Sequence, residues 1–333
     1  MDGGTSGLSM RGKKCRMPPM FKPNLWSRIM VVALGVTFIA PAPAQEKSAQ
    51  SAAQPLAHFH HLHLNVTDPQ AAISFYTSKL ESEKRKFAGA VDAVWARNSW
   101  LLFTKVKAAP NSDITSAIWH MGWGGGENMK ETYQKQIDSG TKFQTPITDI
   151  SDQCDGKGGN GRFFFSYIDG PDHALIELNT TADGVTYFNH VHLLSEDPIA
   201  AGDWYIKEFG LQRRGQTPPS RELRFRCGRQ TGPSVGLVMD DVNIIIYPVG
   251  NAKAAFPDAW KGREVLEGSQ GHTIDHLGFR VDNLDQTLER LKKDGVKVTD
   301  APRVAFDKKI RYAFIEGPDH IRIEVLEDHT VKE

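Results

Sequence analysis

The sequence predicts an α+β protein built from four βαβββ units arranged as an internal duplication. Two observations carry this prediction: residues that recur at a constant offset, and strand and helix patterns that alternate within each half. Eight residues that open the first half, His61, His63, Leu64, Asp68, Pro69, Ala71, Ala72 and Tyr76, match His190, His192, Leu193, Asp197, Pro198, Ala200, Ala201 and Tyr205. So many matches at one offset exceed chance, so the two halves are related.

Two further repeats divide each half into two units. The matching segments are Gly170–His173 and Gly317–His320, Ile176–Glu177 and Ile323–Glu324 and, more weakly, His120–Trp123 and His276–Phe279. The weaker pair has the character of a strand that precedes a helix, as at His61 and His190. Four units are therefore expected, each opening near a histidine.

Each unit begins with a strand pattern that is followed by a helix pattern. Residues 61–66 alternate polar and apolar side chains, and Asp68–Pro69 provides an N-cap followed by proline at the first helical position. That helix is expected to run to about Leu80. Its apolar face and those of the other three helices are interpreted as core: Ala72, Phe75, Tyr76 and Leu80; Met129, Tyr133 and Ile137; Ala201, Trp204, Tyr205 and Phe209; Leu284, Leu288 and Leu291. Extended segments are expected at 90–96, 100–106, 163–168, 174–179, 243–247, 312–315 and 321–326.

The first 44 residues have the pattern of a cleavable signal peptide. Six basic residues precede an apolar run at 29–40, and an Ala-x-Ala site follows, so cleavage is expected after Ala44, with a linker at 45–57. The run is too short for a membrane span, which needs roughly twenty residues. We therefore expect a periplasmic or secreted protein without a stable membrane anchor, and two free thiols at Cys154 and Cys227.

The charge balance argues against a nucleic-acid partner. The whole chain is formally neutral, and removal of six basic residues and one acidic residue with the leader leaves a net charge of minus five. A small-molecule substrate is the expected partner. The sequence leaves open whether the protein forms a homo-oligomer.

These residues resemble the vicinal oxygen chelate superfamily, which includes glyoxalase I, fosfomycin-resistance enzymes, bleomycin-binding proteins and extradiol dioxygenases. The resemblance covers about residues 58–327. In that family two βαβββ units pair, and their mixed sheet curls round an open cleft. The resemblance therefore implies two such domains, residues 58–182 and 186–328, each formed by the two units of one half.

The resemblance also implies a metal site in each domain, with ligands from the first and last strands of its units. The two ligand sets are His61, His120 and Glu177 in the first domain, and His190, His276 and Glu324 in the second. Alternation along the first strand places His63 and Asn65 on the same face as His61. Two imidazoles and one carboxylate leave positions open on Fe²⁺ or Mn²⁺, the expected ions, with Zn²⁺, Ni²⁺ and Co²⁺ as alternatives.

The reaction class depends on a fourth ligand. In glyoxalase I this ligand comes from the last strand of the first unit of a pair, and Leu102 and Ile245 stand at those places here. Three-coordinate centres and dioxygenase-like chemistry are therefore slightly favoured, with Tyr167, His63 and Asn179 as catalytic candidates. Against the cleavage of catechols, Gly-Pro pairs at 170 and 317 replace the acidic-proline turn of the extradiol dioxygenases.

Two other functions stay open. One is a glyoxalase-type lyase or isomerase acting on a 2-oxo or 2-hydroxy compound, in which the metal stabilises an enediolate. The other is a metal-free ligand-binding or resistance protein, against which the intact ligand sets argue. The sequence does not identify the substrate.

Overall fold

The computed structural model describes residues 56–151, 159–215, 218–226 and 228–330. They belong to one compact unit, residues 53–333. The expected signal peptide, most of the linker, Cys154 and Cys227 lie outside the described residues. Within the described ranges, no helix has the length and apolar character needed to cross a membrane.

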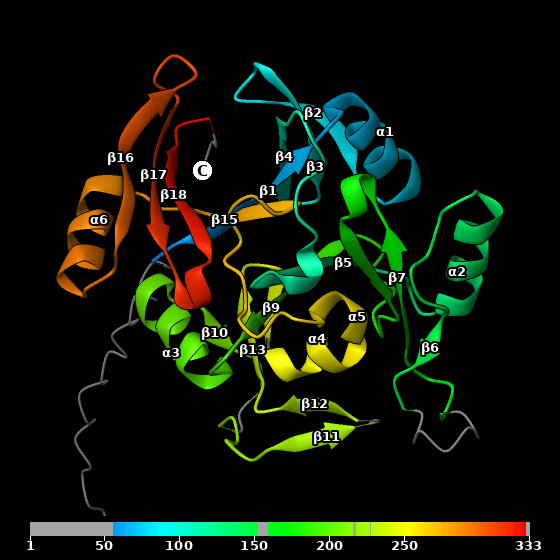
Figure 1. The fold of residues 1–333 in the computed structure, drawn as a ribbon. Coiled ribbons are helices and arrows are strands. Elements are labelled where there is room, and N and C mark those ends of the chain that lie inside the picture. Colours follow the sequence, from blue (N-terminus) through cyan, green and yellow to red (C-terminus); the bar gives the residue numbers. More distant parts are fainter. Residues whose placement is uncertain (1–55, 152–158, 216–217, 227, 331–333) are drawn as a thin grey trace, which may run out of the picture. The chain divides into compact units, whose positions relative to one another are not determined.

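Two open, mixed sheets of eight strands each form the fold (Figure 1). In spatial order, the first sheet contains β16 (Val298–Ala305), β17 (Ile310–Glu316), β18 (Arg322–Asp328), β15 (Ile274–Arg280), β1 (His58–Val66), β4 (Ser99–Lys105), β3 (Val91–Ala96) and β2 (Glu83–Phe87). The second contains β10 (Gln212–Arg213), β13 (Val235–Met239), β14 (Val242–Pro248), β9 (Phe188–Ser195), β5 (Ile118–Gly124), β8 (Leu175–Asn179), β7 (Phe164–Asp169) and β6 (Thr148–Asp149). A separate hairpin joins β11 (Arg224–Arg226) to β12 (Arg229–Gly232). The predicted α+β class is confirmed.

Each sheet combines one unit from each half of the chain. The first and fourth units meet where β1 pairs antiparallel with β15, and the second and third meet where β5 pairs antiparallel with β9. The structure differs here from the expected pairing, in which residues 58–182 and 186–328 would each fold into a sheet of their own. All four units share one local pattern, so that pattern does not specify which unit pairs with which.

The helices follow the first strand of each unit and pack on the sheets. They are α1 (Pro69–Lys79), α2 (Met129–Asp138), α3 (Pro198–Phe209) and α6 (Leu284–Lys293), with α4 (Val249–Ala255), α5 (Pro257–Trp260) and the 3-10 turns Asp113–Thr115, Pro171–His173 and Pro318–His320 between strands. Most of the predicted apolar residues are buried, but Ile137 of α2 is 41% exposed, so the core face of that helix is shorter than expected.

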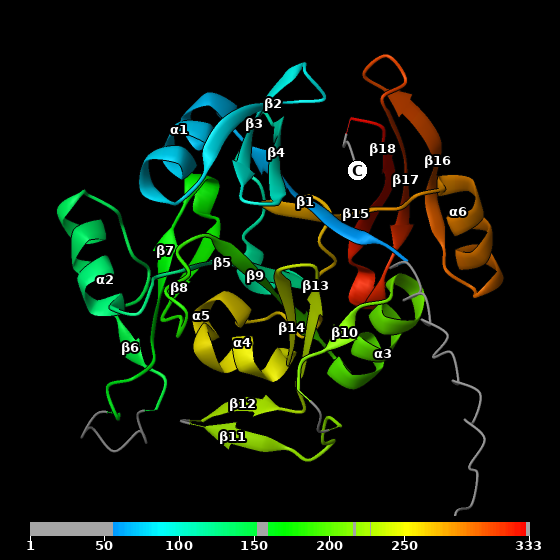
Figure 2. The same cartoon turned by 180° about the vertical axis from the view of Figure 1, so that it is seen from behind.

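Aromatic side chains from both sheets fill the space where the two sheets meet. The Phe59 ring of β1 lies 6.0 Å from Phe188 of β9, and Phe279 of β15 lies 4.7 Å from Phe209 of α3. Beside them, Arg290 of α6 donates to the buried carboxylate of Glu208 in α3 at 2.8 Å. Figure 2 shows helices α3 and α6 as neighbours. Helices α3 and α6 belong to different sheets, so this ion pair joins the two.

The N-caps of α1 and α3 form as predicted. The carboxylate of Asp68 accepts hydrogen bonds from the backbone N–H groups of Gln70 and Ala71, and Asp197 caps α3 in the same way. We expect Asp68→Ala to lower the free energy of unfolding by about 1 kcal/mol, because two backbone donors lose their acceptor. Urea denaturation would measure this, and Asp68→Ser should retain most of the stability. Loss of metal binding at unchanged stability would contradict the role as a cap.

Candidate metal centres

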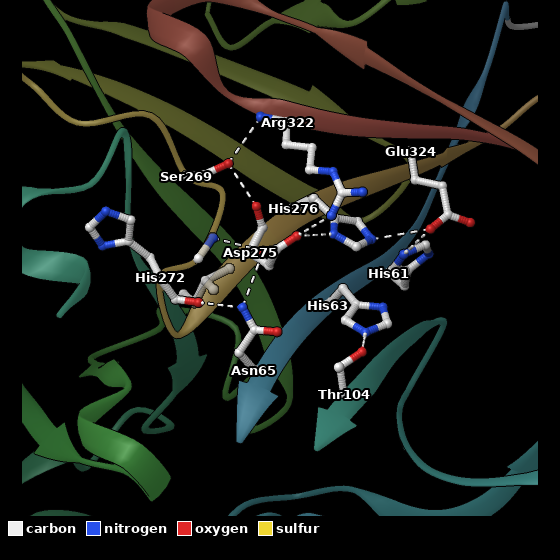
Figure 3. A network of polar contacts seen from close by, with 12 residues as sticks. His61, His63, Asn65, Thr104, Ser269, His272, Asp275, His276, Arg322 and Glu324 are labelled. Atoms are coloured by element: carbon white, nitrogen blue, oxygen red, sulfur yellow. Dashed lines mark hydrogen bonds and ion pairs between the residues drawn. The ribbon is translucent and has the colours of Figure 1, made fainter. Parts of the chain in front are cut away.

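A first cluster of side chains that could hold a metal ion lies on β1, β15 and β18 of the first sheet. It consists of His61, His63, His276 and Glu324, whose ligand atoms all lie within 4.8 Å of one another. One carboxylate oxygen of Glu324 is 3.1 Å from Nε2 of His276 and 3.6 Å from Nε2 of His61 (Figure 3). The two imidazoles and the carboxylate therefore converge on one point.

A second cluster has the same construction on β5, β8 and β9 of the second sheet. Its members are His120, Glu177, His190 and His192, all buried. Nε2 of His120 is 3.1 Å from one carboxylate oxygen of Glu177, and Nε2 of His190 is 3.8 Å from the other. Each member corresponds by the internal repeat to a member of the first cluster.

The strand registers bring these side chains together across a glycine. In the first sheet His61 pairs with Gly278, and Gly278 pairs with Glu324 on its other side. In the second sheet Gly122 stands in the same way between His190 and Glu177. Because each glycine lacks a side chain, the histidine ring can extend over the central strand toward the carboxylate.

The donor set fits a divalent metal ion. Nε2 of His61 and Nε2 of His190 are buried and have no hydrogen-bond partner among the described residues. Buried nitrogens without partners are rare, because a lost hydrogen bond costs free energy. Two imidazole nitrogens and a carboxylate are the ligands of a facial site for Fe²⁺, Mn²⁺ or a related ion.

The structure divides the predicted ligand sets differently. The six predicted residues all fall in the two clusters, but His61 lies with His276 and Glu324, whereas His120 and Glu177 lie with His190. This exchange follows from the pairing of β1 with β15 and of β5 with β9.

The three predicted catalytic residues are also separated. Tyr167 and Asn179 line a cavity at the second cluster, whereas His63 belongs to the first cluster. His192 takes the corresponding place beside Tyr167 and Asn179. The constant offset between His63 and His192 is the sequence signal that relates them.

His63 and His192 each stack on a histidine of the predicted ligand sets. His63 stacks on His276 with ring centroids 4.5 Å apart, and His192 stacks on His120 at 4.4 Å and an interplanar angle of 19°. Rings that are stacked nearly parallel do not direct their in-plane lone pairs at one point. The cross-strand partners of His63 and His192 are Leu102 and Ile245. Neither of these apolar residues can supply a fourth ligand.

Burial keeps most of these imidazoles neutral. It lowers the pKa of His120 to about 3 and the pKa of His190 to about 4. Burial likewise lowers the pKa values of His61 and His192 well below the ordinary 6.5. His276 differs, because hydrogen bonds to two carboxylates outweigh its burial and raise its pKa. A neutral imidazole is the form that binds a metal.

A cavity of about 910 Å³ opens on the second cluster. Glu177, His190 and His192 form part of its wall, together with Tyr167 and Asn179. A volume in this range suits a small-molecule ligand. A ligand in this cavity would therefore reach both the metal-binding side chains and the polar groups beside them.

Comparisons with known proteins agree with this geometry. Residues 187–325 match the Glyoxalase/Bleomycin resistance protein/Dioxygenase superfamily. The match covers the third and fourth units of the chain. No curated protein matches the chain by sequence.

Two solved structures show that a known fold extends over most of the chain. A mutant of glyoxalase I from Zea mays is similar with a TM-score of 0.59 and 15% identity, over 82% of this chain and 94% of that chain. A proposed dioxygenase from Bacillus subtilis is similar with a TM-score of 0.52 and 15% identity, over 82% of this chain and 86% of that chain. At this identity the likeness concerns the fold.

The glycine between the ligands provides a test of the second cluster. A Cβ atom at Gly122 would lie 1.9 Å from Cε1 of His190, so Gly122→Ala should displace the ring and remove one bound metal ion. The control is Gly236→Ala in the same sheet, where the nearest atom, Cβ of Arg214, would be 3.5 Å away. Metal analysis of the dialysed proteins measures the result. Full metal content in Gly122→Ala would contradict the geometry.

The lowered histidine pKa values predict acid lability of the metal-free protein. As the pH falls from 6.5 toward 4, the unfolded chain binds protons that folded His120 and His190 do not bind. The free energy of unfolding should therefore decrease with falling pH in this window. The raised pKa of His276 does not oppose this, because its contribution is lost only above 6.5.

Urea denaturation at several pH values would measure the decrease. His120→Gln is the control, because glutamine stays neutral and should make the dependence shallower. Stability that is constant or increases toward pH 4 would contradict the prediction.

Proposed function

We propose that the chain is a metal-dependent enzyme whose active site is the second cluster with its cavity. Its substrate would be a small molecule that binds the metal through neighbouring oxygen atoms. The observation that carries the proposal is a buried two-histidine, one-glutamate set of which Glu177 and His190 line a cavity of about 910 Å³. Fe²⁺ or Mn²⁺ is the ion expected there, with Zn²⁺, Ni²⁺ and Co²⁺ as alternatives. A divalent ion would supply Lewis acidity and hold the oxygens of the substrate.

Tyr167 is suited to donate a hydrogen bond rather than to accept a proton. Burial raises the pKa of its hydroxyl well above 10, and the charge of Glu177 raises it further. The phenol therefore stays protonated near neutral pH. Asn179 complements it on the cavity wall, because its buried Oδ1 has no hydrogen-bond partner among the described residues.

His192 offers a neutral imidazole to the cavity, although its lowered pKa makes it a weak base. Its lowered pKa keeps the ring neutral, and Nδ1 is buried and lacks a hydrogen-bond partner in the described part of the chain. The ring also faces the cavity. General base catalysis requires such a neutral imidazole within reach of the substrate.

Dioxygenase-like chemistry is the first candidate for the reaction. Stacking of His192 on His120 leaves three protein ligands. Three protein ligands would leave positions open on a divalent ion for the substrate and a further small molecule. The second candidate is a lyase or isomerase acting on a 2-oxo or 2-hydroxy compound, which the neutral, unpaired His192 favours because such reactions require proton transfer.

We further propose that the enzyme acts in the periplasm or outside the cell. The signal-peptide pattern of residues 1–44 supports this location. A small-molecule substrate at a buried site needs no nucleic-acid or membrane partner.

The proposed function predicts how metal and activity follow the ligands. His120→Ala with Glu177→Ala should remove one ion and all turnover, because only one ligand is left at the second cluster. His276→Ala with Glu324→Ala should remove the other ion and retain turnover. The cross-pair His61→Ala with Glu177→Ala should weaken both sites.

Anaerobic titration with Fe²⁺ or Mn²⁺ measures the ions, and a panel of catechols and 2-oxo compounds measures turnover and oxygen consumption. Oxygen consumption would indicate the first candidate reaction, and anaerobic turnover the second. If the wild-type protein binds none of these ions, the enzyme proposal fails and a metal-free binding protein replaces it.

A further inference from the structure

The two clusters differ in the groups behind the ligand rings, which are the groups that contact Nδ1 of the histidine ligands, directly or through another side chain. In the first cluster, Nδ1 of His276 is 2.7 Å from the buried carboxylate of Asp275. Arg322 donates to the same carboxylate oxygen at 2.8 Å (Figure 3). A carboxylate at Nδ1 fixes the tautomer that presents Nε2 to a metal and makes that nitrogen a stronger ligand.

A second carboxylate reaches the first cluster through a histidine. Nδ1 of His61 is 2.7 Å from Nδ1 of His60, and Nε2 of His60 is 3.1 Å from Asp328. In the tautomers that leave Nε2 of His61 free for a metal, His61 donates to His60 and His60 donates to Asp328. Both imidazole ligands of the first cluster are therefore supported by a carboxylate.

The second cluster has no carboxylate behind its rings among the described residues. Nδ1 of His190 faces the amide oxygen of Asn189 at 2.5 Å, and Nδ1 of His120 is buried without a hydrogen-bond partner in the described ranges. Asn189 occupies the place of His60 in the repeat, and Trp119 occupies the place of Asp275.

The charges around the two clusters differ as a result. Glu324, Asp275 and Asp328 give the first cluster three negative charges, and Arg322 offsets one of them. A divalent cation there would be neutralised. At the second cluster Glu177 is the one carboxylate among the described residues that would support an ion, so a net positive charge would remain.

The side chains around the two clusters also differ, with apolar packing at the first and a cavity at the second. Leu102 of the first sheet packs with the buried side chains of Phe87, Ile310 and Leu326. Its counterpart Ile245 lines the cavity of the second sheet. Two arginines on the cavity wall, Arg214 and Arg229, make no ion pair with any described residue.

We infer that the two clusters have different roles. The first binds a divalent cation tightly and holds it as a structural ion, whereas the second binds a cation more weakly and keeps a positive charge that attracts an anionic, oxygen-chelating substrate. The statement about an anionic substrate rests on the proposed function. The difference in affinity rests only on the groups behind the rings.

Titration of the metal-stripped full chain with Zn²⁺, in competition with a chromophoric chelator, tests the inference. The wild-type protein should show two phases whose affinities differ by about 10-fold or more. Glu324→Ala should lose the tight phase, and Glu177→Ala should lose the weak phase. These two variants assign each phase without an activity measurement.

Two substitutions that exchange a carboxylate and an amide test whether the groups behind the rings cause the difference in affinity. Asp328→Asn should weaken the tight phase by about 10- to 100-fold, because the carboxylate behind His60 is lost while the shape is kept. Asn189→Asp should strengthen the weak phase by about 10-fold, because it places a carboxylate at Nδ1 of His190. Both substitutions keep the size of the side chain, and they should change the metal affinity in opposite directions.

Substrate charge is tested with the zinc-loaded protein and the pair 3,4-dihydroxybenzoate and catechol. The carboxylate-bearing compound should bind more tightly, and Arg214→Gln should reduce its advantage.

Equal affinities for both ions, loss of the tight phase in Glu177→Ala, or no change in Asn189→Asp would overturn the inference. Preferential binding of catechol would overturn its substrate clause. Two separated phases without turnover of any compound would support the inference and contradict the proposed function, so the two failures are distinguishable.

Discussion

Both clusters depend on a histidine ring that extends over a glycine of the neighbouring strand. Adjacent strands lie about 4.8 Å apart, so His61 and Glu324, which flank β15, are separated by about twice that spacing. Their side chains meet only if the residue between them leaves the space free. Gly278 does so in the first sheet and Gly122 in the second. The second imidazole, two residues before each glycine, then points to the same face because side chains alternate along a strand.

Much of the fold followed from the sequence because its signals are local. Aspartate followed by proline specified the start of α1 and α3, and alternation specified the strands that carry ligands. Strand β2 was not predicted, because its residues Glu83 to Lys86 are all exposed and show no alternation. The family resemblance pointed to six ligand candidates, and the structure places all six in the two clusters, since a repeated histidine or glutamate remains visible wherever its strand is placed.

The pairing of the units could not be predicted in this way. Units one and three share a pattern, and so do units two and four, so His61 has the same local environment in either arrangement. Long-range packing decides between them, including the contact of Phe59 with Phe188 and the ion pair of Arg290 with Glu208. The groups behind the rings were missed for the same reason. His60 meets Asp328 across almost the whole described chain, which no local pattern reveals.

Because units one and four pair, a metal ion in the first cluster would join the two ends of the described chain. Its ligands His61 and Glu324 lie on the first and last strands of the described chain, β1 and β18, with β15 between them. An ion bound by both would oppose separation of the two ends, because unfolding would have to release an ion that the unfolded chain binds poorly. The second cluster joins β5, β8 and β9, which belong to consecutive units joined by the short segment 180–187. An ion bound there would close a smaller loop, so less stability would depend on it. A cluster on which stability depends less can bind and release an ion and a substrate while the fold remains intact.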